Sequence, residues 1–181
     1  MCRISPRPLR GLALCAFCAL AIVASTAAAI AADSALQPRV RSSHAYIRAM
    51  VEEAAQRSAT FRRLVAAIDA TDGIVYVEQG VCGHSVRACL SLHVVPAAGY
   101  RILRVMVDPR QPDWEVMSSI GHELQHALEV LGNAALTTTE AVFLFYSHGQ
   151  SSGDSFETTE AVRAGNSVRN EVGSYAKRKL S

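Results

Sequence analysis

Residues 112–131, PDWEVMSSIGHELQHALEVL, decide how this 181-residue chain is organised. Apolar side chains recur at helical spacing and form one stripe, which consists of Val116, Ile120, Leu124, Ala127 and Leu131. Pro112 and Asp113 are typical of a helix start, and Gly132-Asn133 is typical of a helix end. The sequence therefore predicts a long amphipathic helix that begins at Pro112-Asp113 and runs to Leu131.

Residues 122–126, HELQH, form an HExxH motif on this helix. Histidines at positions i and i+4 project from one helical face, so the imidazoles of His122 and His126 can reach one metal ion. Glu123 lies beside them, where its carboxylate can hold the water that a metal activates. At about 100° per residue, both histidines fall opposite the apolar stripe, so they face either solvent or a cleft. Glu115 and Glu129 share this polar side and are expected to orient the imidazoles.

The segments around this helix predict the fold class. Residues 42–70 repeat apolar side chains at helical spacing, with Ser58 as a candidate cap between two helices. Three β-rich segments joined by short loops are typical of an antiparallel meander, and they span 74–78, 88–95 and 100–107. Two further helices are expected after the HExxH helix, over 137–146 and 156–172.

The expected domain is therefore α+β and covers residues 42–176. It comprises one or two N-terminal helices, a three-stranded and mainly antiparallel sheet, the HExxH helix and two C-terminal helices. A short polar linker, 32–41, precedes this domain, and a basic tail, 177–181, follows it.

Residues 1–31 have the layout of a secretory signal peptide. A basic segment, 1–10, precedes an apolar segment, 11–23, and a tail of small residues ends at Ala31, where cleavage is expected. The alternative is an uncleaved membrane anchor over residues 11–32. The leader holds three arginines and no acid, so its removal changes the net charge from +2 to −1. This charge excludes a nucleic-acid footprint and, with the signal, predicts a periplasmic or secreted protein without membrane attachment.

Cysteine usage agrees with export. Only Cys82 and Cys89 remain after the leader is removed, and an even pair in an oxidising compartment favours a disulfide that closes the segment CGHSVRAC. The alternative is a metal site that includes His84, although this loop offers three ligands at most, whereas a structural zinc site needs four.

From residue 74 to residue 172 the chain resembles zincin-type metalloproteases of the gluzincin kind. More narrowly, it resembles small bacterial exported proteins in which a HELQHALEV helix is followed by a helix rich in Glu and Thr. In the wider group a small sheet backs the HExxH helix, and a later helix supplies a third metal ligand. The resemblance implies zinc as the cofactor, His122 and His126 as ligands, and Glu123 as the catalytic base. The further histidine of the metzincin extension is absent, since Gly132 and Asn133 stand there.

Three acids compete for the role of third ligand. Glu157 is favoured because a Glu-Thr pair is typical of the last helix in the exported proteins that the chain resembles. Glu140, at the start of the helix after the turn, is the first alternative, and Glu160 is the second. Tyr146 and His148 are candidates to stabilise an oxyanion.

Two functions of different classes follow from these residues. The first is an exported zinc-dependent hydrolase of peptide bonds, a metallopeptidase in which a zinc-activated water attacks a peptide or protein substrate with Glu123 as general base. The second is a non-catalytic exported domain that binds metal or a partner and keeps HExxH as a relic. Retention of Glu123 favours the first function, since a pure binding site has no need of a base between its histidines.

Overall fold

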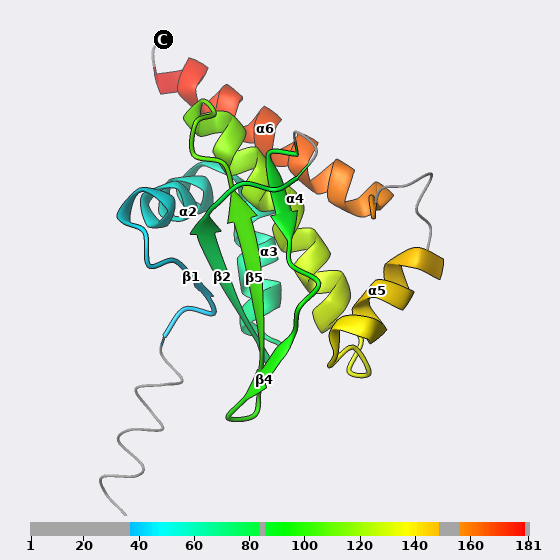
Figure 1. The fold of residues 1–181 in the computed structure, drawn as a ribbon. Coiled ribbons are helices and arrows are strands. Elements are labelled where there is room, and N and C mark those ends of the chain that lie inside the picture. The colour runs from blue at the N-terminus through cyan, green and yellow to red at the C-terminus, as the bar shows by residue number, and fades with distance from the viewer. Residues whose placement is uncertain (1–36, 84–85, 149–155, 180–181) are drawn as a thin grey trace, which may run out of the picture. The chain divides into compact units, whose positions relative to one another are not determined.

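The structure is a computed structural model, and it describes residues 37–83, 86–148 and 156–179 (Figure 1). The predicted signal peptide, the alternative anchor and His84 lie outside these residues. Within them, no helix combines the length and the apolar character that crossing a membrane requires.

The predicted helices are confirmed, but their ends differ, and the last helix continues seven residues beyond its predicted end at residue 172. They are α2 (Ala45–Arg57), α3 (Ala59–Asp69), α4 (Asp113–Leu131), α5 (Thr139–His148) and α6 (Thr159–Lys179). Ser58 separates α2 from α3, and its hydroxyl accepts a hydrogen bond from the backbone N–H of Phe61, as expected of an N-cap. Because α6 begins at Thr159, Glu157 lies in the segment before the helix and not inside it.

The sheet differs from the prediction. It is a mixed sheet of five strands, which are β1 (Val40–Arg41), β2 (Gly73–Gln79), β3 (Ala88–Leu90), β4 (Val95–Ala97) and β5 (Tyr100–Val107). The order is β1-β2-β5-β3, and β4 also pairs with β5. β1 pairs with β2 in parallel, and so does β5, whereas β3 and β4 run antiparallel to β5. The prediction of a three-stranded, mainly antiparallel sheet is therefore wrong, although the α+β class is confirmed.

The physical reason lies in what periodicity encodes. Alternation of apolar and polar residues marks a strand, but it is the same for parallel and antiparallel partners. β2 pairs with β5 along its whole length, so the chain between them has to return to the starting end of the sheet. It does so through β3 and β4, two short strands that pair antiparallel with β5 along the edge opposite β2. Ala98 and Gly99 then turn the chain into β5, both with positive φ.

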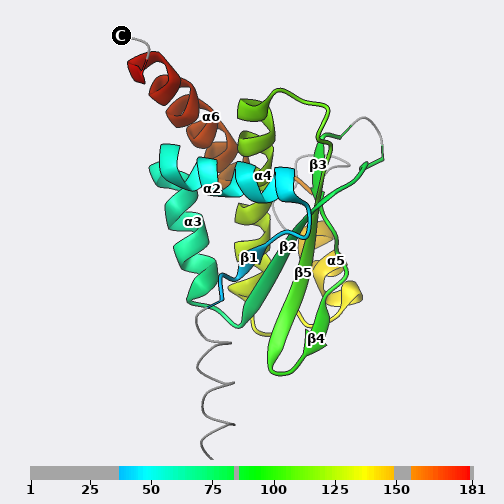
Figure 2. The same ribbon diagram turned by 90° about the vertical axis from the view of Figure 1, so that its left-hand side faces the viewer.

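The helices cover one face of the sheet. Every second side chain of the two central strands lies on the face that α3 and α4 cover. These side chains are fully buried, and they are Val75, Val77, Leu103 and Val105. Figure 2 shows these two helices beside the strands. α6 packs along α4, and Figure 1 shows the two helices side by side.

The predicted disulfide is confirmed. Cys82 follows β2, Cys89 lies on β3, and the bond between them spans seven positions in sequence. It ties the loop that leaves the central strands to the edge strand that returns beyond β5.

Candidate metal centre

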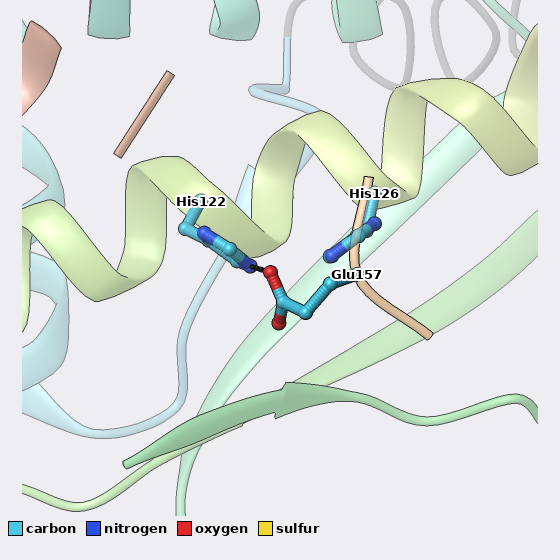
Figure 3. A group of neighbouring side chains, drawn as sticks. All are labelled: His122, His126 and Glu157. Atoms are coloured by element: carbon cyan, nitrogen blue, oxygen red, sulfur yellow. Dashed lines mark ion pairs between the residues drawn. The ribbon is translucent and has the colours of Figure 1, made fainter. Parts of the chain in front are cut away.

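Three side chains from two segments converge at the centre of α4. His122 and His126 project from adjacent turns of this helix, and Glu157 reaches them from the segment before α6 (Figure 3). Each offers one ligand atom, and these atoms all lie within 4.8 Å of one another. His122 Nε2 lies 3.3 Å from Glu157 Oε2. Of the three acids that compete for the third position, the structure brings Glu157 into the group.

The donor set could hold a metal ion, and zinc is the ion that the sequence predicts. Catalytic zinc takes three protein ligands from imidazole nitrogens and carboxylate oxygens, with bonds of about 2.0–2.2 Å. Such bonds place neighbouring ligands of a tetrahedral ion about 3.4 Å apart. The pair His122 and Glu157 already has this separation, and no two ligand atoms of the group exceed it by more than about 1.4 Å.

Glu129 orients the second histidine, as the sequence predicts. Its Oε2 lies 3.0 Å from His126 Nδ1, and its Oε1 accepts a hydrogen bond of 2.7 Å from the hydroxyl of Thr158. Burial opposes the charge on Glu129, but these hydrogen bonds outweigh it and lower the pKa of Glu129. The ionised carboxylate can only accept, so Nδ1 of His126 carries the proton and Nε2 is left to face the ligand group.

The pKa values of the two histidines are shifted in opposite directions. Burial lowers the pKa of His122, against the opposing charge of Glu157, and a neutral imidazole is the form that binds metal. Burial is also the largest single influence on His126 and lowers its pKa. The hydrogen bond that His126 donates to Glu129, together with the negative charges around the ring, outweighs burial and raises the pKa of His126. His122 is therefore ready as a ligand, and His126 gives up a proton when a cation binds.

Glu123 lies in the same cleft and is only 6% exposed. Its Oε1 is 4.0 Å from His122 Nε2, and the backbone N–H of Leu90, on strand β3, donates to its carboxylate. Burial raises the pKa of Glu123 to about 7, against the opposing effect of His126. A buried carboxylate with one backbone donor, directed at two imidazoles, is placed to exchange protons with a molecule in the cleft.

A cavity of about 750 Å³ opens beside these residues. Glu123, His126 and Glu157 form its polar part. The rest of the lining is mainly apolar and includes Leu90, Leu92, Phe156 and the ring of Tyr146. The histidines therefore face a cleft, and the polar side of α4 is covered by β3 and by the segment before α6. A cavity of this size accommodates a peptide segment.

Several predicted residues lie elsewhere. Glu140 is exposed on α5, and Glu160 pairs with Arg163, so neither joins the ligand group. Glu115 contacts two arginines in place of a histidine. His148 is exposed and its Nδ1 contacts the carbonyl oxygen of Leu144, away from the cleft lining.

Tyr146 contacts His126. Its hydroxyl donates to the carbonyl oxygen of His126 at 3.0 Å and lies 3.5 Å from Nδ1 of the same residue. Burial raises the pKa of Tyr146, so the phenol stays protonated. It therefore supports His126 from the side of Nδ1, and its role toward an oxyanion stays a prediction.

Sequence reasoning missed three positions. Leu90 contributes through its backbone, so no residue type could have revealed it. Thr158 links Glu157 to Glu129, and the ET pair at 157–158 was the available signal. Gly165 lets α6 approach His122, since a Cβ at this position would lie 3.1 Å from the Cβ of His122.

Comparison of the chain with models of known protein families, with curated proteins and with solved structures found no match.

Proposed function

We propose that this chain is an exported, zinc-dependent hydrolase of peptide bonds. The observation that carries the proposal is the burial of Glu123 in the same cleft as His122, His126 and Glu157. Burying a carboxylate is costly, and a site that only stored a metal would need the histidines but no acid between them. Burial acts on the pKa of Glu123 more strongly than the backbone of Leu90 does, so the pKa stays raised, which suits a base.

The residues divide the chemistry between them. Zinc in a site of two imidazoles and one carboxylate polarises a carbonyl group and makes water more acidic. Glu123 accepts the proton of the attacking water and passes it to the leaving amine. Glu129 keeps the imidazole of His126 in the tautomer that can bind a cation.

The edge of the sheet supports a peptide as the substrate. β3 is the outer strand beyond β5, and Ala88, Cys89 and Leu90 all line the cavity beside the ligand group. An extended peptide can pair with such an edge through its backbone, while apolar side chains enter the cavity. A peptide bound in this way would bring a carbonyl group beside the ion that the three candidate ligands would hold.

The site also supports the expected compartment. The disulfide between Cys82 and Cys89 lies on the strand that lines the cleft, and disulfides persist in oxidising compartments. Together with the predicted signal peptide, this favours a periplasmic or secreted enzyme.

The test compares Glu123→Gln with the parent protein. The substitution keeps the shape of the side chain but removes its ability to accept a proton, so the variant is expected to fold, retain about one zinc per chain and lose at least about 99% of its hydrolysis of an unstructured protein. Zinc is measured by elemental analysis and hydrolysis by fragment release. Glu140→Gln is the matched control, because Glu140 is exposed and outside the ligand group.

Other outcomes would contradict the proposal in different ways. Loss of zinc from Glu123→Gln would make Glu123 a ligand. Stoichiometric zinc in the double variant His122→Ala, His126→Ala would remove the metal site from this cleft. A zinc-loaded parent that cleaves no member of a broad substrate panel would favour the alternative, a non-catalytic metal-binding or partner-binding domain.

A further inference from the structure

A second cavity, of about 290 Å³, is lined by His122. It shares Glu123 and Glu157 with the larger cavity, so the two are branches of one cleft that meet at the ligand group. The lining of the second branch is more polar, since it includes Arg87, Arg169 and Asn166. The two branches therefore suit different chemical groups of one ligand.

The two arginines converge on a single acid. Arg87 Nη1 lies 3.2 Å from Glu115 Oε2, and Arg169 Nη2 lies 3.8 Å from Glu115 Oε1. The guanidinium of Arg169 also lies over the ring of Trp114, 5.3 Å from its centroid. One carboxylate cannot neutralise two guanidinium groups, so this end of the cleft keeps a net positive charge. The side chains of Arg87 and Arg169 are 58% and 48% exposed, which leaves their N–H donors accessible to a ligand.

Helical geometry places Arg169 relative to the candidate ligands. Gly165 contacts His122, and Arg169 follows it by four residues on the same face of α6. Four residues of helix rise about 6 Å, which equals about two residues of an extended peptide. A peptide with its reacting carbonyl beside His122 would therefore bring a group about two residues away to the arginines.

The acids of this branch do not cancel that charge. Glu123 and Glu157 line it, but Glu157 is a candidate ligand and Glu123 lies beside the ligand group, so a bound dication would offset their charge. Glu115 is the acid in direct contact with the arginines, and it is already shared between them.

We propose that Arg87 and Arg169 bind a carboxylate of the substrate, about two residues from the bond that is cut. The inference rests on the proposed function, because it needs a peptide in the cleft. A carboxylate matches the forked donors of a guanidinium, and two arginines can hold one carboxylate between them. The carboxylate belongs either to the C-terminus of a peptide or to an Asp or Glu side chain.

The test measures binding separately from hydrolysis. The probes are a pentapeptide of apolar residues with a free C-terminal carboxylate, the same peptide as an amide, and amides with one glutamate at each position in turn. They are titrated into zinc-loaded Glu123→Gln, which binds without turnover, by calorimetry and by the fluorescence of Trp114, the single tryptophan of the chain. Trp114 reports directly because a ligand that draws Arg169 away changes the stacking on its ring.

We expect a carboxylate-bearing probe to bind about tenfold more tightly than the plain amide. Preference for the free acid identifies a C-terminal carboxylate, and preference for one glutamate amide identifies an acidic side chain. Arg169→Met and Arg87→Met should each remove most of the preference. Glu115→Gln should increase the affinity about threefold, because it removes the competing carboxylate. Arg163→Met is the control, since this arginine lies on the same helix, pairs with Glu160 and does not line the cleft.

Equal affinity for all probes, or a preference that persists in both arginine variants, would overturn the inference, as would the absence of binding by every probe. The proposed function has its own readout, which is hydrolysis by the parent protein. Cleavage without carboxylate preference would leave the function and remove the inference. Carboxylate-dependent binding without cleavage would leave the carboxylate site and remove the proposed hydrolysis.

Discussion

Replacement of Arg101 by methionine is expected to destabilise the end of the helix that carries the metal ligands. Arg101 lies on β5, and its side chain is only 6% exposed. Its guanidinium donates to the carbonyl oxygens of Leu131 and Asn133, at 2.7 and 2.8 Å, and to that of Val130 at 3.2 Å. It also forms a forked ion pair with Asp72. The side chain therefore caps the C-terminus of α4, where carbonyl groups lack helical partners.

The expected loss follows from these contacts. In Arg101→Met the buried carbonyl of Leu131 loses its charged donor, which costs about 1–3 kcal/mol, and the carbonyls of Val130 and Asn133 each lose about 0.5–1.5 kcal/mol. Asp72 is 47% exposed, so water replaces its partner at a cost of about 0–1 kcal/mol. We therefore expect a loss of about 2–7 kcal/mol, a large part of the stability of an ordinary domain.

Equilibrium unfolding in urea measures this loss. Arg104→Met is the matched control, because Arg104 lies on the same strand but is exposed, and it should change the free energy of unfolding by less than about 0.5 kcal/mol. A loss below about 1 kcal/mol for Arg101→Met would refute the reasoning, since it would mean that the carbonyls of α4 do not depend on this side chain.

The ion pair adds a pH dependence of known sign. Hydrogen bonds from Arg101 hold the pKa of Asp72 below its usual range. The folded-state pKa is the lower one, so the pair stabilises the fold above the ordinary aspartate pKa of about 4, and this stabilisation is lost as the pH falls through the folded-state pKa. The difference in unfolding free energy between the parent and Asp72→Asn should therefore be constant from pH 7 to about pH 5 and shrink below about pH 4. A difference that grows on acidification would contradict the assignment.

Two further predictions concern the site and the disulfide. Gly165→Ala should weaken zinc binding about tenfold, as measured by a competition titration, because the new Cβ displaces His122. The free energy of unfolding should change little, because alanine favours the helix. Gly173→Ala is the control and should leave zinc binding unchanged, because a Cβ at this position meets no atom within 4 Å. In the double variant Cys82→Ser, Cys89→Ser, the free energy of unfolding in urea should fall by about 2–3 kcal/mol. Reduction of the parent protein should raise its intact mass by about two mass units. Free thiols at both positions in the exported protein would refute the bond.

The sequence by itself determined the elements that depend on local geometry. Two histidines four residues apart on an amphipathic helix have to share a face, and the structure places both in one ligand group. Glu129 was predictable for the same reason, since a residue at i+3 lies beside His126. Ser58 as a cap and the pairing of Cys82 with Cys89 also follow from short-range chemistry and from parity.

Only the tertiary structure decided how distant segments meet. The pairing of β2 with β5 in parallel could not be read from alternation, because both kinds of sheet have the same period. The choice of Glu157 over Glu140 depends on the path by which the chain enters α6, more than thirty residues after His122. The donor to Glu123 is the backbone of Leu90, and every residue type except proline offers the same N–H, so only the placement of the edge strand against α4 could select it.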